Sequence, residues 1–273
     1  QITNINGSGN DFLTTTITAA MLNTMNYVQS ADTMIITHED LSPLKLLRGG
    51  SDATWTISAV TFDSVPLYAY SLSVSNPTVD ITPSIVSGKI QITASASAFA
   101  TSHVDQYVNA EPQGRARILQ FVSAKEVKAV TEYPFFDTST ITAGNWDLEQ
   151  GYENVWSVSR GFPKSVIFHE GRLYFGGSKS RPSTIWGSKV GLFFDFKPTE
   201  LLDDDAVEAT LDTNQLNSIV DIMSGRDLQI FTTGGEHFVP QSSTNPITPL
   251  TMIFKNVSRH GSKPGTKAIP LES

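Results

Sequence analysis

Short runs of alternating or wholly apolar residues dominate the chain and predict β-strands. The first such runs occupy residues 13–18, 34–37, 54–62 and 66–74. Alternation returns at 115–122 and 125–130, where two adjacent strands predict a hairpin. Between the first two strands, apolar residues at positions 19–22 and 25 fit one or two helical turns better than a strand. The pattern therefore predicts a mainly β protein.

Two later hairpins share one plan. Residues 165–177 and 218–235 each combine an apolar strand, a turn with a Gly-Arg pair, a second strand and a Gly-Gly pair. Residues 32–48 form a weaker third copy, with His38 placed where His169 lies in the first. Recurrence of a multi-strand unit at roughly 40–50 residues is typical of β-propeller blades. Chance similarity among glycine-containing hairpins is the alternative.

The middle of the chain differs in composition from the segments on either side. Pro77, Pro83 and Gly88 interrupt its predicted strands, and large aromatic residues are nearly absent before Phe99. This shift predicts a small separate β-barrel or sandwich over residues 75–145, inserted between propeller-like segments at 1–74 and 146–273.

Composition and charge exclude several kinds of chemical site and of binding function. The 273 residues include 27 Asp and Glu against 19 Lys and Arg, a formal charge of −8, and no cysteine. Disulfides, thiolate metal sites and thiol nucleophiles are therefore excluded. The acidic balance argues against general binding of nucleic-acid phosphates, which depends on clustered Lys and Arg. No apolar run approaches the ~20 residues of a membrane-spanning helix, so no membrane span is expected.

Signatures of catalysis are mostly missing. The sequence has no nucleophile-elbow, dinucleotide, phosphate-loop or paired-histidine zinc motif, so no cofactor is expected. Asp203, Asp204 and Asp205 form the strongest local charge feature, which suits either Ca²⁺ or, as we favour, a solvated loop. The carboxylates eligible for glycoside hydrolysis are too many for one pair to be chosen: Glu153, Glu170, Glu208 and Glu236.

Several strings of residues resemble a known family. These are YVQSADTMIITHED (27–40), RGFPKSVIFHEGRLYFGGSKSRPSTIWGSKVGLFFDF (160–196), LLDDDAVEATL (201–211) and TTGGE (232–236). They are similar to the tail nozzle, or tail tubular, proteins of short-tailed bacteriophages, often labelled phage stabilisation proteins. The resemblance covers about 1–70 and 150–255, whereas 75–145 matches loosely. It implies a β-propeller with inserted β domains and a homo-oligomeric ring that continues the tail tube.

Family members are much longer than this chain. Only about three blade-like units are present, and the sequence starts at Gln1 without an initiator methionine. Because closure of a propeller usually takes at least four blades, we expect a fragment or a truncated relative.

The resemblance also implies that one motif is a blade signature and not an active site. Its residues here are Arg160, Gly161, Pro163, Val166, Phe168, His169, Arg172, Leu173, Phe175, Gly176, Gly177, Arg181 and Pro182. Gly171, Gly176 and Gly177 suit turn positions with positive φ. Arg172 and Arg181 are expected to hold carboxylates, for example those of the acidic loop at 203–205.

The leading functional expectation is a non-enzymatic structural component of the virion tail, made in the host cytoplasm. Its partners would be further copies of itself, the tube adaptor and fibres, with genomic DNA only in transit during ejection. Asp203, Asp204 and Asp205 are predicted to face the channel, where carboxylates would repel phosphates. The alternative is a propeller-type enzyme or binding protein for host surface polysaccharide that uses aromatic residues to stack on sugars. A docking role for 75–145 is compatible with the first expectation.

Overall fold

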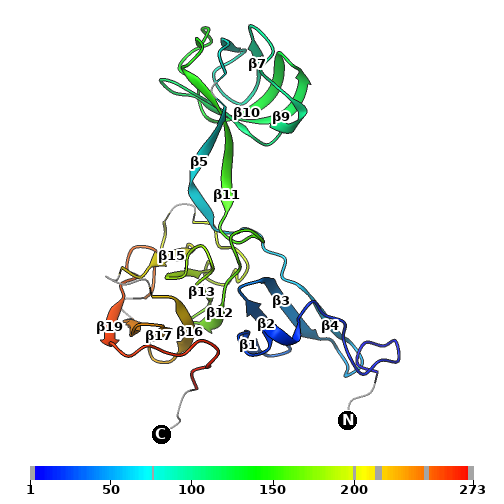
Figure 1. Cartoon of the computed structure of the whole chain (residues 1–273), viewed down its shortest axis with the longest axis vertical. Coiled ribbons are helices and arrows are strands. Elements are labelled where there is room, and N and C mark those ends of the chain that lie inside the picture. Colours follow the sequence, from blue (N-terminus) through cyan, green and yellow to red (C-terminus); the bar gives the residue numbers. More distant parts are fainter. Residues whose placement is uncertain (1–3, 76, 199–200, 213–216, 243–245, 270–273) are drawn as a thin grey trace. The chain divides into compact units, whose positions relative to one another are not determined.

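The computed structural model describes residues 4–75, 77–198, 201–212, 217–242 and 246–269. They form a mainly β protein with two short 3-10 turns, η1 (Ala19–Met21) and η2 (Thr101–His103). The chain divides into two compact units. The main unit comprises Gln1–Pro66 and Asn154–Ser273, and the inserted unit comprises Leu67–Glu153 (Figure 1). The expectation of a mainly β fold is thus confirmed.

Three four-stranded antiparallel sheets make up the main unit, each with its strands in chain order. The N-terminal sheet contains β1 (Asn26–Ser30), β2 (Thr33–His38), β3 (Leu41–Arg48) and β4 (Trp55–Ala59). The middle sheet contains β12 (Ser165–His169), β13 (Arg172–Gly176), β14 (Thr184–Gly187) and β15 (Val207–Thr210). The C-terminal sheet contains β16 (Ile219–Ser224), β17 (Leu228–Thr232), β18 (Glu236–Val239) and β19 (Lys255–Ser258).

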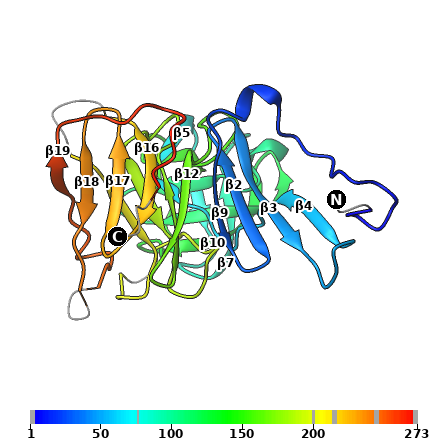
Figure 2. The same cartoon turned by 90° about the horizontal axis from the view of Figure 1, so that it is seen from below.

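The sheets of the main unit pack through their first strands. β12 contacts β1 and β2 on one side and β16 on the other, and Figure 2 shows β16, β12 and β2 next to one another. Buried apolar residues of the middle and C-terminal sheets and of the adjoining loops form a common core: Tyr174, Ile185, Leu211, Ile219, Ile222, Leu228, Ile230, Val239 and Ile247. Removal of this apolar surface from water is the main stabilising contribution at the interface.

The inserted unit is one seven-stranded sheet in the order β5-β11-β8-β9-β10-β7-β6. Its strands are β5 (Leu67–Ser75), β6 (Ile81–Pro83), β7 (Lys89–Ala94), β8 (Tyr107–Ala110), β9 (Arg115–Ser123), β10 (Glu126–Tyr133) and β11 (Trp146–Asn154). The sheet curls around a core that includes Ile92, Ile118 and Trp146. Ile81 and Ile141 exchange two backbone hydrogen bonds of 2.8 and 2.9 Å, which brings β6 close to the segment that leads into β11.

This curled sheet differs from the expected barrel or sandwich. None of the four sheets formed by the described residues closes into a barrel, and the inserted unit has only one sheet. Its limits, Leu67 and Glu153, also lie outside the 75 and 145 expected from composition. The reason is that β5 and β11 pair with each other and extend the inserted sheet, although their residues resemble the aromatic strands of the flanking segments.

Two local expectations were wrong. Residues 13–18 form no strand; Leu13 and Thr15 instead lie beside Trp55 and Ile57 at an apolar hollow on the N-terminal sheet. His38 does not occupy the position of His169 either. His38 ends β2, the second strand of its sheet, whereas His169 ends β12, the first strand of its sheet.

Candidate functional site

The expected blade motif forms the first hairpin of the middle sheet and the approaches to it. His169 pairs with Arg172 across a two-residue turn of Glu170 and Gly171, whose φ values are 42° and 76°. Two consecutive positive φ values match the type I′ turn, whose twist fits the right-handed twist of paired strands. The sequence His-Glu-Gly-Arg thus forms a tight hairpin turn, and Arg172 is the first residue of β13.

Glycines at the end of β13 allow the C-terminal sheet to approach closely. A Cβ on Gly176 would lie 2.5 Å from Ile222 Cδ1 and 2.7 Å from Ser165 Oγ. Gly177 has the expected positive φ of 59°, but Gly176 does not. Gly176 therefore provides space, because a side chain there would displace the side chains of Ile222 and Ser165.

Arg172 is the centre of a buried polar cluster. Its guanidinium donates to the backbone carbonyls of Ser188 (2.6 Å), Asp203 (2.6 Å) and Asp205 (2.5 Å). Burial lowers the pKa of the guanidinium from its usual value. The acidic loop was expected to offer its carboxylates to Arg172, but the arginine binds the loop backbone instead. This leaves the loop carboxylates available for other contacts.

The three carboxylates of the acidic loop have different surroundings. Asp205 is 3% exposed, accepts hydrogen bonds from the backbone N–H groups of Leu201 (3.0 Å) and Ala206 (2.9 Å), and lies 3.7 Å from Lys189 Nζ. Asp203 and Asp204 are exposed. Of the three predicted channel-facing residues, only these two present their carboxylates to solvent.

His169 joins the middle sheet to the C-terminal sheet. It is 3% exposed, and its Nδ1 lies 2.8 Å from Ser224 Oγ at the end of β16. A Ser–His pair at this distance is also the geometry of a nucleophile and its base, but the base then needs a third group to orient it. His169 Nε2 is buried and has no hydrogen-bond partner among the described residues. The His169–Ser224 hydrogen bond links β12 of the middle sheet to β16 of the C-terminal sheet.

The remaining motif residues also lie within or between the strands. Arg181 pairs with Glu208 on β15. Burial raises the pKa of Glu208, although Arg181 acts in the opposite direction. The other members have structural positions: the Arg160 carbonyl accepts from Ser180, Gly161 has a φ of 82°, Pro163 is buried before β12, Phe168 packs on Phe193 and the Pro182 carbonyl accepts from Ile219.

Polar contacts between distant strands complete the site and were not predicted. Asn26 on β1 donates to Asp221 on β16, and both are buried. Thr37 on β2 donates to the carbonyl of Lys164, just before β12, at 3.1 Å. The sequence carries no signal for these contacts, because the Asn26 and Asp221 partners lie 195 positions apart.

Most aromatic residues considered for sugar stacking are buried. Trp156 lies at the centre of one cluster, with 5.1–5.5 Å between its ring centroid and those of its neighbours. The cluster consists of Phe62, Trp156, Phe175, Trp186 and Phe196. Phe62 is partly exposed, and the other four rings are buried in the main unit, so the faces of those four are not accessible to a ligand.

The part of the chain that the structure describes contains no group of three or more His, Cys, Asp or Glu side chains that could hold a metal ion. The eligible glutamates are also dispersed, since Glu208 pairs with Arg181 and Glu236 accepts from Ser258 Oγ in another sheet. Among the described helices, none has the length and apolar character needed to cross a membrane.

Comparison with known proteins gave no relative. Neither a scan against protein-family models nor a search of curated proteins found a match.

Proposed function

We propose that this chain is a non-enzymatic structural component of a bacteriophage tail nozzle, and that the three sheets of its main unit serve as propeller-like blades. The observation that carries the proposal is the use of the motif residues. Arg172, His169 and Arg181 all bind groups within the main unit. We take these internal bonds as support for a structural role, because they hold the strands and the acidic loop in one arrangement.

The arrangement of the sheets supports the same function. Each is a four-stranded meander in chain order, and successive sheets pack through their first strands. Propeller blades are also four-stranded sheets, so this arrangement supports the proposal. The resemblance of residues 27–40, 160–196 and 201–211 to tail nozzle proteins adds the phage context.

The channel for DNA would be formed by several copies of the chain. Asn26 on β1 bonds directly to Asp221 on β16, so the first and third sheets lie within side-chain reach of each other. A DNA duplex cannot pass between strands that are this close. We therefore place the channel between protomers and expect a homo-oligomeric ring.

The acidic loop is suited to the wall of such a channel. Arg172 fixes its backbone through the carbonyls of Asp203 and Asp205, while the carboxylates of Asp203 and Asp204 stay exposed. Fixed carboxylates repel phosphates and keep the polymer mobile, whereas Lys and Arg would retain it.

Immunogold labelling of short-tailed particles from a culture that carries the coding sequence tests the proposal. Antibodies raised against the purified chain are expected to label the tail, with an unrelated antibody as the control. Absence of the chain from purified particles by mass spectrometry would contradict the proposed function.

A further inference from the structure

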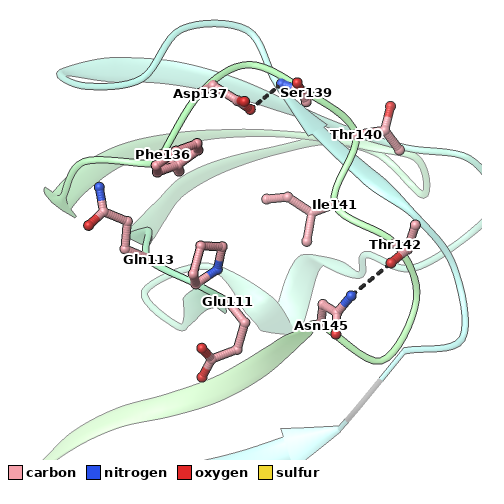
Figure 3. A pocket seen from close by; sticks show the side chains of 10 residues that line it. Glu111, Gln113, Phe136, Asp137, Ser139, Thr140, Ile141, Thr142 and Asn145 are labelled. Atoms are coloured by element: carbon pink, nitrogen blue, oxygen red, sulfur yellow. Dashed lines mark hydrogen bonds between the residues drawn. The ribbon is translucent and has the colours of Figure 1, made fainter.

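A pocket of the inserted unit has the chemistry of a ligand site. It has a volume of about 220 Å³ and lies between the β8–β9 turn and the segment that precedes β11. The residues that line it include Glu111, Gln113, Phe136, Asp137, Ile141 and Asn145 (Figure 3). All belong to the inserted unit, so the blade motif has no part in it.

The walls of the pocket are held in place by bonds to the rest of the sheet. The backbone N–H of Glu111 donates to the carbonyl of Asn145 at 2.7 Å, which joins the two walls. Ile141 is tied to Ile81 by its two backbone hydrogen bonds, and Ala143 N–H donates to Asp80 Oδ1 at 2.9 Å. The pocket is therefore formed before a ligand arrives, which lowers the entropic cost of binding.

Apolar and polar groups face the pocket from different sides. Phe136 is 71% exposed, and Figure 3 shows the Ile141 side chain pointing into the space beside it. An exposed aromatic ring next to an aliphatic side chain offers a surface for C–H groups. Exposure of so large a ring is unfavourable in water, and a ligand that covers it would gain from the burial.

The polar groups are hydrogen-bonding side chains that are only partly used. Asn145 Nδ2 donates to Thr142 Oγ1 at 2.8 Å, which leaves its carbonyl oxygen as an acceptor. The side chains of Glu111 and Gln113 make no hydrogen bond with the residues that the structure describes. Asp137 is instead engaged by the backbone N–H of Ser139 at 2.7 Å. Glu111, Gln113 and Asn145 thus supply acceptors and donors around an apolar surface.

We propose that this pocket binds one pyranose ring of a neutral or amino-sugar glycan. A pyranose presents hydroxyl groups at its edge and C–H groups on its face, which match the amide and carboxylate rim and the Phe136 surface. Glu111 and Asp137 are the only charged side chains that line the pocket, so uronic acids, sialic acids and phosphorylated sugars are repelled. The proposal adds glycan recognition by the inserted unit to the structural role of the main unit, and it does not depend on that role.

The test uses the full chain on an array of neutral, amino and anionic oligosaccharides, followed by calorimetry with the best-bound glycan. Phe136→Ala removes the apolar surface and Gln113→Ala removes one polar group. The matched control is Tyr133→Ala, because Tyr133 is also a largely exposed aromatic residue (61%) but does not line the pocket. Circular dichroism of each variant verifies that the inserted sheet is folded.

The proposal predicts binding of neutral or amino sugars that is weakened about tenfold or more by Phe136→Ala and by Gln113→Ala. Tyr133→Ala should bind like the parent protein. Three results would overturn the proposal: no neutral or amino glycan bound at millimolar concentration, a preference for anionic glycans, or equal weakening by Phe136→Ala and Tyr133→Ala.

Discussion

Arg172 illustrates how one residue can organise a loop that lies more than 30 positions away. It reaches three backbone carbonyls in two segments, and any residue type supplies a backbone carbonyl. The sequence indicated that Arg172 and the acidic loop belong together, since a planar guanidinium suits paired acceptors. The sequence could not indicate which atoms Arg172 binds. Residue types predict contacts between side chains, but they do not predict which backbone carbonyls point toward the arginine.

Replacement of Arg172 by lysine should destabilise the main unit by about 2–4 kcal/mol. An ammonium group cannot serve all of these carbonyls, so at least one is left buried without a donor. Urea denaturation followed by circular dichroism measures the free energy of unfolding. Arg48→Lys is the control, since Arg48 is an exposed arginine paired with Asp52; a loss at Arg172 no larger than at Arg48 would refute the role of the cluster.

Tyr174 gives the stability of the protein a specific dependence on pH. Burial raises the pKa of its hydroxyl to about 12, whereas the hydroxyl ionises near pH 10 in an unfolded chain. Between these values the unfolded state releases the proton and the folded state retains it. The free energy of unfolding should therefore fall by about 1.4 kcal/mol per pH unit from pH 10 to 12.

Thermal denaturation across that pH range measures this effect, with Tyr174→Phe as the matched variant. The difference in stability between parent and variant should be constant below pH 10 and should shift against the parent protein above it. Parallel profiles up to pH 12 would show that Tyr174 ionises as easily in the folded protein as in the unfolded chain.

The strands themselves follow from local sequence. The hairpins β9–β10, β12–β13 and β16–β17 coincide with predicted ones, because alternating apolar residues and tight turns act over a few neighbouring positions. Residues 13–18 were also predicted as a strand but form none, and Leu13 and Thr15 lie beside Trp55 and Ile57 of the N-terminal sheet instead. Sheet membership and the contact of Asn26 with Asp221 depend on tertiary packing, which local pattern does not encode.

Contact between the middle and C-terminal sheets should be sensitive to a single methyl group. Gly176→Ala places a Cβ against Ile222 and Ser165, and overpacking of this kind typically costs about 1–3 kcal/mol. Differential scanning calorimetry should record a lower Tm. Gly50→Ala is the control, because a Cβ at Gly50 meets no atom within 4 Å; equal Tm values for the two variants would mean that the sheets are not in close contact at β13.

At the scale of the whole molecule, composition predicted the class of fold, but it did not predict whether a sheet closes into a barrel. The mainly β character could be read from the sequence, since it depends on the average properties of long segments. The single curled sheet of the inserted unit could not, because closure is decided by the pairing of edge strands. The ring remains a prediction, since assembly depends on surfaces between separate chains.

Single-particle electron microscopy of the purified full chain at physiological salt tests the central claim most directly. We predict a closed ring of identical protomers whose lumen is lined by acidic side chains, including those of Asp203 and Asp204. A protein that stays monomeric at high concentration, or a ring with Lys and Arg on the lumen wall and these two aspartates on the outer surface, would contradict the account.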